Sequence, residues 1–538
     1  MKSITQTTTV DGGGHITLTG GLATRLFNVS NGVTLTLRNI VLDQFAAAGA
    51  DGGAIFSNGT LVLGNTTIQL SQTDINHSGG AIYSAGPVFI SNSTLKKNMG
   101  GSAGAMFINN SNARAQVSNS VFNANQALNT TTGYGGAIWV GAQAKLTVVD
   151  GRFTGNSAQF GGALYVTQGG TATLSSQLSV DFEQMKFDDN LVTYGGAGCG
   201  GGGTCSAGGA IYSEGDLTIN SVVFNHNQTP LITPLVGNGG AIASRGTLRM
   251  YNDEFIFNSA RFGGALYVGP LAGAALGSVR TTIDATTFDL NSATVLGGAL
   301  YTAGYTSVVT ATQVVFHRNT ASDGGGGVAR YESNLRLVDS SFTDNHAATA
   351  GGGLYVASGG TDPGQVFVRS VTFSGNQTSG GNHGGGIANG FSGAFFPNGG
   401  VVSLNSVTVF SNTNGIFNAG LSVQTVLTNT VLSNPGSLNC DGAAFAVMSG
   451  GHNFSTDNSC VLNGPGDQKG AGLDAKLGPR QLEATFFHLP LPGSPLINAG
   501  ANCPPRDQRG ATRVGACDIG AVEFGGLLMR ALLPLIRR

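Results

Sequence analysis

The stretch GGAIWVGAQAKLTVVDGRFTGNSAQFGGALYV, residues 135–166, decides the fold of this chain. It begins and ends with Gly-Gly-Ala before an aliphatic residue, and between these copies Phe153 and Asn156 stand in the spacing Phe-x-x-Asn. The segment Lys145–Val148 alternates and contains β-branched residues, which is a strand signal, and helical periodicity is absent. The stretch therefore predicts short strands joined by tight turns.

The Gly-Gly-Ala motif recurs along most of the chain. Copies lie at Gly52–Ile55, Gly79–Ile82, Gly135–Ile138, Gly161–Leu164, Gly208–Ile211, Gly239–Ile242, Gly263–Leu266 and Gly297–Leu300, with looser ones at Gly325–Val328, Gly352–Leu354 and Gly385–Ile387. The pair of glycines allows a tight corner, and the small alanine leaves room for neighbouring coils to approach.

The Phe-x-x-Asn motif recurs in step with it. Its copies are Phe122/Asn125, Phe153/Asn156, Phe187/Asn190, Phe224/Asn227, Phe255/Asn258, Phe288/Asn291, Phe316/Asn319, Phe342/Asn345 and Phe373/Asn376. Successive copies lie roughly 25–35 residues apart, within the range of solenoid repeats. We therefore expect an all-β fold, a right-handed single-stranded parallel β-helix, over residues 1–430. Stacked coils would place the phenylalanines in an interior column of rings and the asparagines in a hydrogen-bonded ladder.

Composition agrees with a folded chain that turns often. The 538 residues include 87 glycines but only 15 prolines, so collagen is excluded, and 41% of the residues are hydrophobic, which excludes disorder. A formal net charge of −2, without runs of lysine or arginine, argues against nucleic acid and anionic membranes as partners. No apolar stretch is long enough for a transmembrane helix.

The six cysteines form three pairs of near neighbours in sequence. They are Cys199 with Cys205, Cys440 with Cys460, and Cys503 with Cys517. An even number in local pairs predicts short-loop disulfides made in an oxidising compartment, whereas a zinc site lacks its usual spacings. The apolar core of a signal peptide is missing from Met1–Val10. Either the export signal is missing from this sequence or the protein is cytosolic, and the paired cysteines favour the first, so we expect an extracellular or cell-surface location. Because Ile4–Asn31 already has a strand pattern, we also expect an N-terminal truncation.

The paired motifs over roughly residues 50–390 resemble the repeats of the polymorphic outer membrane proteins of chlamydiae. That resemblance implies a pectin-lyase-like solenoid that serves as an adhesive passenger on a bacterial surface. In that family a C-terminal membrane barrel exports the passenger. The strand pattern of such a barrel is not visible before the end of this sequence.

Residues 431–524 resemble a second family, the choice-of-anchor Q regions of extracellular β-helix proteins. The matching segments, in order, are Cys440-Asp441-Gly442, Gly451-His452-Asn453, Gly493-Ser494-Pro495, Asn498-Ala499-Gly500, Asp507-Gln508-Arg509-Gly510 and Cys517-Asp518-Ile519-Gly520-Ala521 with Glu523. This resemblance implies export and surface attachment. We expect Asp507, Arg509, Asp518 and Glu523 to form an ion-pair network that closes the open end of the solenoid. A short apolar and basic tail, residues 525–538, follows.

A carbohydrate-active enzyme is the alternative function, because polysaccharide lyases and glycoside hydrolases use carboxylates gathered on one face. The charged clusters are few and lie beside the repeat motifs, which favours solvated turn residues over catalysis. They are Asp181/Glu183 with Asp188/Asp189, Asp253/Glu254, and His317/Arg318 with Asp323. We expect no catalytic residue and no metal site.

Three further features have a structural and a binding interpretation. Asp51-Gly52-Gly53 and Asp323-Gly324-Gly325 are isolated fragments of a calcium-binding repeat, so no cofactor is expected and calcium has only this weak support. Trp139 is the single tryptophan, and a structural aromatic is favoured over a sugar platform. The tyrosines that follow the glycine motif are expected to be exposed in a column, either lining the core or forming a shallow binding strip; they are Tyr165, Tyr212, Tyr267 and Tyr301.

These features favour a structural or adhesive rod on the cell surface that presents loops to a glycan, to another cell or to copies of itself. The enzyme remains the alternative, and clustering distinguishes the two. Charged residues gathered from adjacent coils favour an enzyme, whereas a flat face of Asn, Thr and Ser favours adhesion.

Overall fold

A computed structural model gives the structure of the protein, and it contains β-strands but no α-helix in the part of the chain that it describes. It has no helix that is long and apolar enough to cross a bilayer in that part. The chain divides into two compact units, unit 1 (Met1–Thr282 and Thr286–Ser307) and unit 2 (Ile283–Ala285 and Val308–Arg538). The described residues are 1–109, 113–129, 131–177, 184–193, 206–229, 237–270, 279–359, 364–379, 383–391, 398–420, 423–443 and 446–527.

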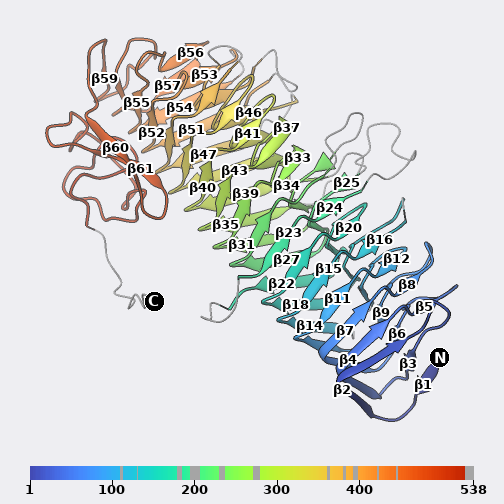
Figure 1. Ribbon diagram of the computed structural model, residues 1–538. Helices are drawn as coiled ribbons and strands as arrows, with labels where there is room; N and C mark the ends of the chain where they lie inside the picture. The colour runs from blue at the N-terminus through green and yellow to red at the C-terminus, as the bar shows by residue number, and fades with distance from the viewer. Residues whose placement is uncertain are drawn as a thin grey trace. The chain divides into compact units, whose positions relative to one another are not determined.

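In unit 1 most coils contribute one strand to sheet A, two to sheet B and a short one to sheet C, and these strands pair in parallel with their equivalents one coil away (Figure 1). Sheet A contains β1 (Lys2–Ile4), β3 (Phe27–Val29), β6 (Ile55–Ser57), β9 (Ile82–Ser84), β13 (Met106–Ile108), β17 (Ile138–Val140), β21 (Leu164–Val166), β26 (Ile211–Ser213), β30 (Ile242–Ser244), β34 (Leu266–Val268) and β38 (Leu300–Ala303).

Sheet B of unit 1 has two columns of strands. The first three coils contribute long strands that run through both columns, β2 (Thr8–Thr19), β4 (Thr34–Asp43) and β7 (Thr60–Gln69). The first column continues with β10 (Val88–Ser91), β14 (Arg114–Ser118), β18 (Lys145–Val149), β22 (Thr171–Ser175), β27 (Asp216–Asn220), β31 (Leu248–Tyr251) and β35 (Arg280–Asp284). The second contains β11 (Thr94–Lys96), β15 (Val121–Asn123), β19 (Arg152–Thr154), β23 (Lys186–Asp188), β28 (Val223–Asn225), β32 (Glu254–Ile256) and β36 (Thr287–Asp289).

The third side of the coil is formed by short strands of sheet C. In unit 1 they are β5 (Ala46–Ala47), β8 (Gln72–Thr73), β12 (Met99–Gly100), β16 (Gln126–Ala127), β20 (Ser157–Ala158), β24 (Leu191–Val192), β25 (Ser206–Ala207), β29 (Gly237–Asn238), β33 (Ser259–Phe262) and β37 (Ser292–Leu296).

Unit 2 repeats this arrangement. Its sheet A strands are β42 (Val328–Tyr331), β46 (Leu354–Ala357), β50 (Ile387–Asn389), β53 (Ile416–Asn418) and β56 (Cys440–Gly442). The first column of sheet B contains β39 (Val308–Thr312), β43 (Asn334–Val338), β47 (Gln365–Arg369), β51 (Val401–Asn405), β54 (Gln424–Thr428) and β57 (Val447–Ser449). The second contains β40 (Val315–His317), β44 (Ser341–Thr343), β48 (Thr372–Ser374), β52 (Thr408–Phe410), β55 (Val431–Ser433), β58 (Phe454–Ser455) and β59 (Gln468–Lys469), and sheet C contains β41 (Thr320–Ala321), β45 (His346–Ala347) and β49 (Gln377–Thr378). The predicted parallel β-helix is confirmed.

A coil turns at three corners, and residues with positive φ stand at most of those that the structure describes. In the coil quoted above these are Gly135 (φ 62°), Asp150 (φ 54°) and Gly155 (φ 61°). The glycine that follows the first corner is required for a different reason. A Cβ on Gly136 would lie 2.0 Å from the carbonyl oxygen of Gly162 in the next coil, closer than atoms can approach. The Gly-Gly pair thus combines a left-handed turn with a close approach of backbones.

Phenylalanines fill the interior at the second column of sheet B. Within unit 1 the rings of Phe122 and Phe153 stack with centroids 4.8 Å apart, and the column continues through Phe187, Phe224, Phe255 and Phe288. Within unit 2 the rings of Phe316, Phe342 and Phe373 stack with centroids 4.6 Å apart. All of these side chains are fully buried, so they form the hydrophobic core of each unit.

The asparagines form ladders beside these columns. Asn125 donates from its side-chain amide to Oδ1 of Asn156 (3.0 Å) and to the carbonyl of Leu95 (2.9 Å), while its own Oδ1 accepts from the backbone and the side chain of Asn98. Every polar atom of this buried amide is therefore satisfied. The same pattern runs through Asn190, Asn227, Asn258 and Asn291 in unit 1, and through Asn319, Asn345, Asn376, Asn412 and Asn434 in unit 2.

Parallel strands continue past residue 430, where the sequence analysis ended the solenoid, as far as β59. The chain then runs alongside the coils of unit 2 and forms an antiparallel hairpin of β60 (Leu477–Leu482) and β61 (Phe486–Pro490), which contacts β44 and β48. In the hairpin Arg480 pairs with Asp344 (2.7 Å), and His488 bonds Ser374 (2.9 Å). The C-terminal segment is therefore fixed to the side of the coils.

Candidate ligand-binding groove

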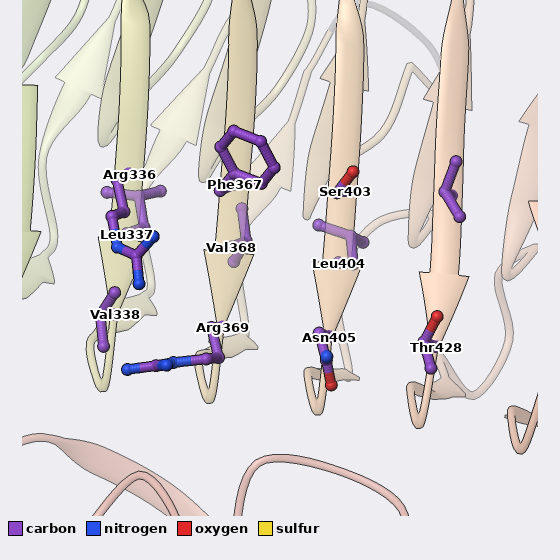
Figure 2. A pocket seen from close by; sticks show the side chains of 11 residues that line it. Arg336, Leu337, Val338, Phe367, Val368, Arg369, Ser403, Leu404, Asn405 and Thr428 are labelled. Carbon is purple, nitrogen blue, oxygen red and sulfur yellow. The ribbon is translucent and has the colours of Figure 1, made fainter. Parts of the chain in front are cut away.

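A groove of about 320 Å³ lies on the outer face of β43, β47, β51 and β54 in unit 2. Two rows of outward side chains cross these strands. The parallel register places Arg336, Phe367, Ser403 and Val426 side by side in one row, and Val338, Arg369, Asn405 and Thr428 in the next (Figure 2). The buried residues Leu337, Val368 and Leu404 alternate with them and point into the core, so strand periodicity alone sets which side chains reach the groove.

Phe367 is the aromatic residue of this groove, and it is 45% exposed. Among the described residues no aromatic ring packs against it, unlike the stacked phenylalanines of the core. An aromatic face that is open to solvent is a surface on which an apolar or C–H-bearing ligand face can stack. Ser403, Asn405 and Thr428 add hydroxyl and amide groups along one side of it.

Two arginines border the same ring. Arg336 lies beside Phe367 on the neighbouring strand, and Arg369 follows it two residues later on β47 (Figure 2). Within the described part of the chain neither guanidinium lies within ion-pair distance of a carboxylate, and the Nε of Arg369 is buried without a hydrogen-bond partner. The groove therefore holds two cationic groups whose hydrogen-bonding capacity is not used by the protein.

Asp339, at the corner after β43, interacts electrostatically with Arg369 and so affects the net charge of the groove. Burial raises the pKa of Asp339 to about 6, with a contribution from Asp507, while Arg369 and Arg513 oppose the shift. Its carboxyl group thus changes charge near the lower end of the physiological pH range.

Unit 1 has a neutral counterpart of this groove. Phe89 occupies the same position in its coil as Phe367, is 39% exposed and lines a groove of about 220 Å³ with Val62, Gln116 and Thr147. No charged residue lines this second groove among the described residues. The two grooves therefore differ mainly in charge.

Among the described residues, none of the charged clusters that the sequence offered for catalysis lines the groove. Asp181 and Glu183 lie outside the described residues. Asp188 and Asp189 come together with His226, with their ligand atoms within 4.8 Å of one another, on an exposed corner. In unit 2, His317 bonds the hydroxyl of Thr343 (2.9 Å) and lies 3.7 Å from Asp344.

Asp253 has a structural position. It is buried at 2% exposure and accepts hydrogen bonds from the backbone N–H groups of Val222 (2.9 Å) and Tyr251 (3.0 Å). Serines occupy the equivalent corner elsewhere, where Ser93 donates its N–H to Ser120 Oγ (3.1 Å). Burial raises the pKa of Asp253 to about 8, and the two backbone N–H groups oppose the shift.

The expectation that the column of tyrosines is exposed is wrong. Tyr165 and Tyr212 are 5% and 2% exposed, although they point outward from sheet A. Both hydroxyls donate to Glu214, at 2.6 and 2.8 Å, and Tyr134 stacks on Tyr165 with centroids 4.4 Å apart. Tyr267 and Tyr301, also buried, stack at 5.5 Å. Neighbouring side chains thus cover what strand alternation alone predicts to be open.

Trp139 belongs to this outer aromatic column. Its ring contacts Phe107 (4.6 Å) and Tyr165 (5.6 Å) edge to face, and its Nε1 donates to Thr167 Oγ1 (2.6 Å). Its ring system is engaged by neighbours, in contrast to the ring of Phe367.

The four residues expected to close the open end lie together in unit 2. Arg509 pairs with Asp507 (2.7 Å), the backbone N–H of Asp518 donates to Glu523 (3.0 Å), and Asp507 Oδ2 accepts from the N–H of Glu523 (3.0 Å). A fifth member, Arg513, was not predicted from the sequence; it pairs with Glu523 at 3.0 Å.

The position of this network differs from the expected one. Gly520 and Ala521 donate to the carbonyl of Asn429 (2.9 Å) and the hydroxyl of Thr408 (3.1 Å), so the network lies beside the coils of β52 and β55. Apolar contacts explain this position of the network. Val431 and Phe454 point outward from these coils and are buried against Leu496 and Ile519 of the C-terminal segment.

Two of the three predicted disulfides are confirmed, and both staple the C-terminal region of unit 2. They are Cys440–Cys460 and Cys503–Cys517, which close loops with sequence separations of 20 and 14. The third predicted disulfide, between Cys199 and Cys205, is not among the bonds that the structure describes. Residues Cys199 and Cys205 both lie outside the described residues, so this pairing stays a prediction.

The groove itself was not found from the sequence. Its signal is an aromatic residue at an outward position of an alternating strand, with arginine at the outward position of the preceding strand. That pattern becomes visible only when Asn334–Val338 and Gln365–Arg369 are placed in register.

Residues 339–357 match the family model of the Chlamydia polymorphic membrane protein repeat. The matched residues include Phe342, Asn345 and the glycines before Leu354, and they run from the corner after β43 to the end of β46 in unit 2. No curated protein matches the sequence. The match confirms the resemblance to this repeat, and it begins directly after β43.

Proposed function

We propose that the protein is a bacterial surface protein whose solenoid is a scaffold for glycan binding, and that the groove around Phe367 is the binding site. The observation that carries the proposal is the open ring of Phe367, 45% exposed on a flat sheet face and bordered by arginine, serine, asparagine and threonine side chains. Aromatic faces and such polar groups are the means by which protein sites hold sugars, since the C–H face of a pyranose is apolar and its hydroxyls form hydrogen bonds.

A surface location has separate support. The matched repeat is a polymorphic membrane protein repeat, and both described disulfides require an oxidising compartment. We propose further that residues 431–524 are a choice-of-anchor Q-like region, on the resemblance of their ordered motifs. In this proposal the C-terminal segment attaches the protein, and the coils present the groove.

A binding role is favoured over catalysis by the composition of the groove. The residues that line it include no aspartate, glutamate or histidine, so the paired carboxylates of a glycosidase are not provided there. Two unpaired arginines and an open ring are suited to holding a ligand.

The test is retention of the purified protein on a panel of immobilised polysaccharides, with reducing and unsaturated sugar ends measured in the eluate. We expect retention without release of sugar ends. Phe367→Ala should weaken retention about tenfold, the effect of losing about 1.4 kcal/mol. Phe89→Ala is the matched control, because it removes a similarly exposed phenylalanine, at 39%, from the same coil position in the neutral groove, and it should leave retention unchanged.

Release of sugar ends would replace the binding proposal with the enzyme alternative. Equal retention of the Phe367→Ala and wild-type proteins would show that the groove is not the site. Binding to a protein partner or to copies of the chain, with no retention on any glycan, would also overturn the proposal.

A further inference from the structure

We propose that the ligand of the Phe367 groove is a glycan that carries carboxylate groups. This inference rests on the proposed function and adds the chemical class of the ligand. Its basis is an imbalance of charge: the outward positions of β39, β43, β47, β51 and β54 carry two arginines, Arg336 and Arg369, and neither aspartate nor glutamate.

Neither arginine forms an ion pair within the described residues, although Arg369 interacts electrostatically with the nearby Asp339. Two other arginines of unit 2 form ion pairs, Arg480 with Asp344 (2.7 Å) and Arg509 with Asp507 (2.7 Å). Arg336 and Arg369 have no such pair among the described residues, and the buried Nε of Arg369 lacks a hydrogen-bond acceptor. A buried donor without an acceptor costs free energy, and no group of the described chain offsets that cost at Arg369.

Both arginines lie next to the ring of Phe367. Arg336 is the direct neighbour of Phe367 across the pair of strands, and Arg369 lies two residues further on the same face of β47 (Figure 2). A sugar ring that stacks on Phe367 therefore has one guanidinium at its side and another near its end. A carboxylate attached directly to the sugar ring lies close to the ring and offers two oxygens, which suits the planar fork of a guanidinium.

The part of the groove on β51 and β54 is polar and uncharged. Ser403, Asn405 and Thr428 continue away from the arginines and present small polar groups to solvent. Hydroxyls of the neighbouring sugars find donors and acceptors there without further charge. The groove is thus cationic at the side of β43 and β47 and neutral at the side of β51 and β54.

The experiment compares the affinity of the full chain for three soluble oligosaccharides of equal length that are neutral, carboxylated or sulfated. We expect the carboxylated one to bind at least tenfold more tightly than the neutral one, and its affinity to fall as salt is raised, because exposed charges are screened over about 10 Å at 0.1 M ionic strength. Arg336→Gln and Arg369→Gln should each reduce its affinity about tenfold and leave the weak binding of the neutral one unchanged.

Arg249→Gln is the matched control. Arg249 is an exposed arginine at the coil position of Arg336, on β31 of unit 1, where Thr218 is its neighbour on the adjacent strand. Its replacement should leave the affinity unchanged. Because Arg336 is exposed, its replacement is compatible with folding, and an unchanged unfolding temperature checks this.

The outcomes separate this inference from the proposed function. Loss of binding in Phe367→Ala but not in either arginine variant would overturn the inference and leave the glycan site standing. Preference for the sulfated over the carboxylated ligand would overturn the assignment of carboxylate. Absence of binding to all three, with no effect of Phe367→Ala, would overturn both.

Discussion

Asn190 donates two hydrogen bonds to a single oxygen, the Oδ1 of Asn227 in the following coil, from its backbone N–H at 3.1 Å and from its side-chain amide at 2.9 Å. The same amide also donates to the carbonyl of Phe153 at 2.9 Å. Its own Oδ1 accepts the equivalent pair of bonds from Asn156. One side chain thus joins three successive coils, in a position with no access to water.

Replacement of Asn190 by alanine is expected to lower the free energy of unfolding by about 3 kcal/mol or more, because it leaves two donors of Asn156 and the carbonyl of Phe153 without partners. Denaturant unfolding followed by circular dichroism measures the change. Asn220→Ala, at an exposed strand end, is the control and should cost less than about 0.5 kcal/mol. Equal effects of the two replacements would contradict the structural role of the ladder.

The two kinds of glycine in a corner are expected to respond differently to alanine. Gly136→Ala forces a Cβ against the carbonyl of Gly162 at 2.0 Å, so the backbones of two coils must separate and the unfolding free energy should fall by about 4 kcal/mol or more. Gly155→Ala meets no atom within 4 Å and suffers only its positive φ, a cost of about 1 kcal/mol. Thermal unfolding of both variants tests this order, and the reverse order would refute it.

Asp253 is expected to make the stability of unit 1 depend on pH. Its pKa is about 8 in the folded chain, where burial disfavours the charge, and near 3.8 when exposed. The folded state therefore binds a proton that the unfolded state has released, so stability is greatest below about pH 4 and is lost as pH rises to about 8.

Asp253→Ser installs the residue that stands at this corner in other coils, and it should remove this dependence. Unfolding free energies measured at pH 5 and pH 8 should differ less in the variant than in the wild type, by on the order of 2 kcal/mol. Identical pH profiles would show that Asp253 does not carry the effect.

Asp339 is expected to tune the groove. Its pKa of about 6 reflects burial and the nearby Asp507, against the opposing charges of Arg369 and Arg513. Protonation below pH 6 removes a negative charge from beside Arg369, so an anionic glycan should bind a few times more tightly at pH 5 than at pH 7.5. Asp339→Asn should bind equally at both pH values, with the affinity of the wild type at pH 5. A wild-type affinity that does not change with pH would contradict this role.

The fold was predictable because the repeat imposes it. Phe153, Asn156 and the glycines at 135–136 each have one physical role that follows from stacking, and the structure shows these roles directly. The groove was not predictable by the same reasoning, because Arg336 and Phe367 obey the strand pattern and depart from the repeat only in identity. Their significance lies in their being neighbours, which requires the register between coils of unequal length.

The strand pattern predicts the direction of the tyrosine side chains but not whether other side chains cover them. Tyr165 and Tyr212 have the outward direction that alternation predicts, and they are covered because Glu214 and Tyr134 lie over them. The C-terminal network was likewise identified by its residues but not by its place, since the apolar patch of Val431 and Phe454 that attracts this segment is spread over two coils.

The asparagine ladder also gives the solenoid a direction of assembly. In each pair the earlier asparagine donates and the later one accepts, as between Asn98 and Asn125. The backbone N–H and the side-chain amide of the earlier asparagine therefore lack this acceptor until the next coil has formed. A chain that folds from its amino end can therefore add each coil to the coils that are already formed. Each new coil satisfies the two asparagine donors of the coil before it.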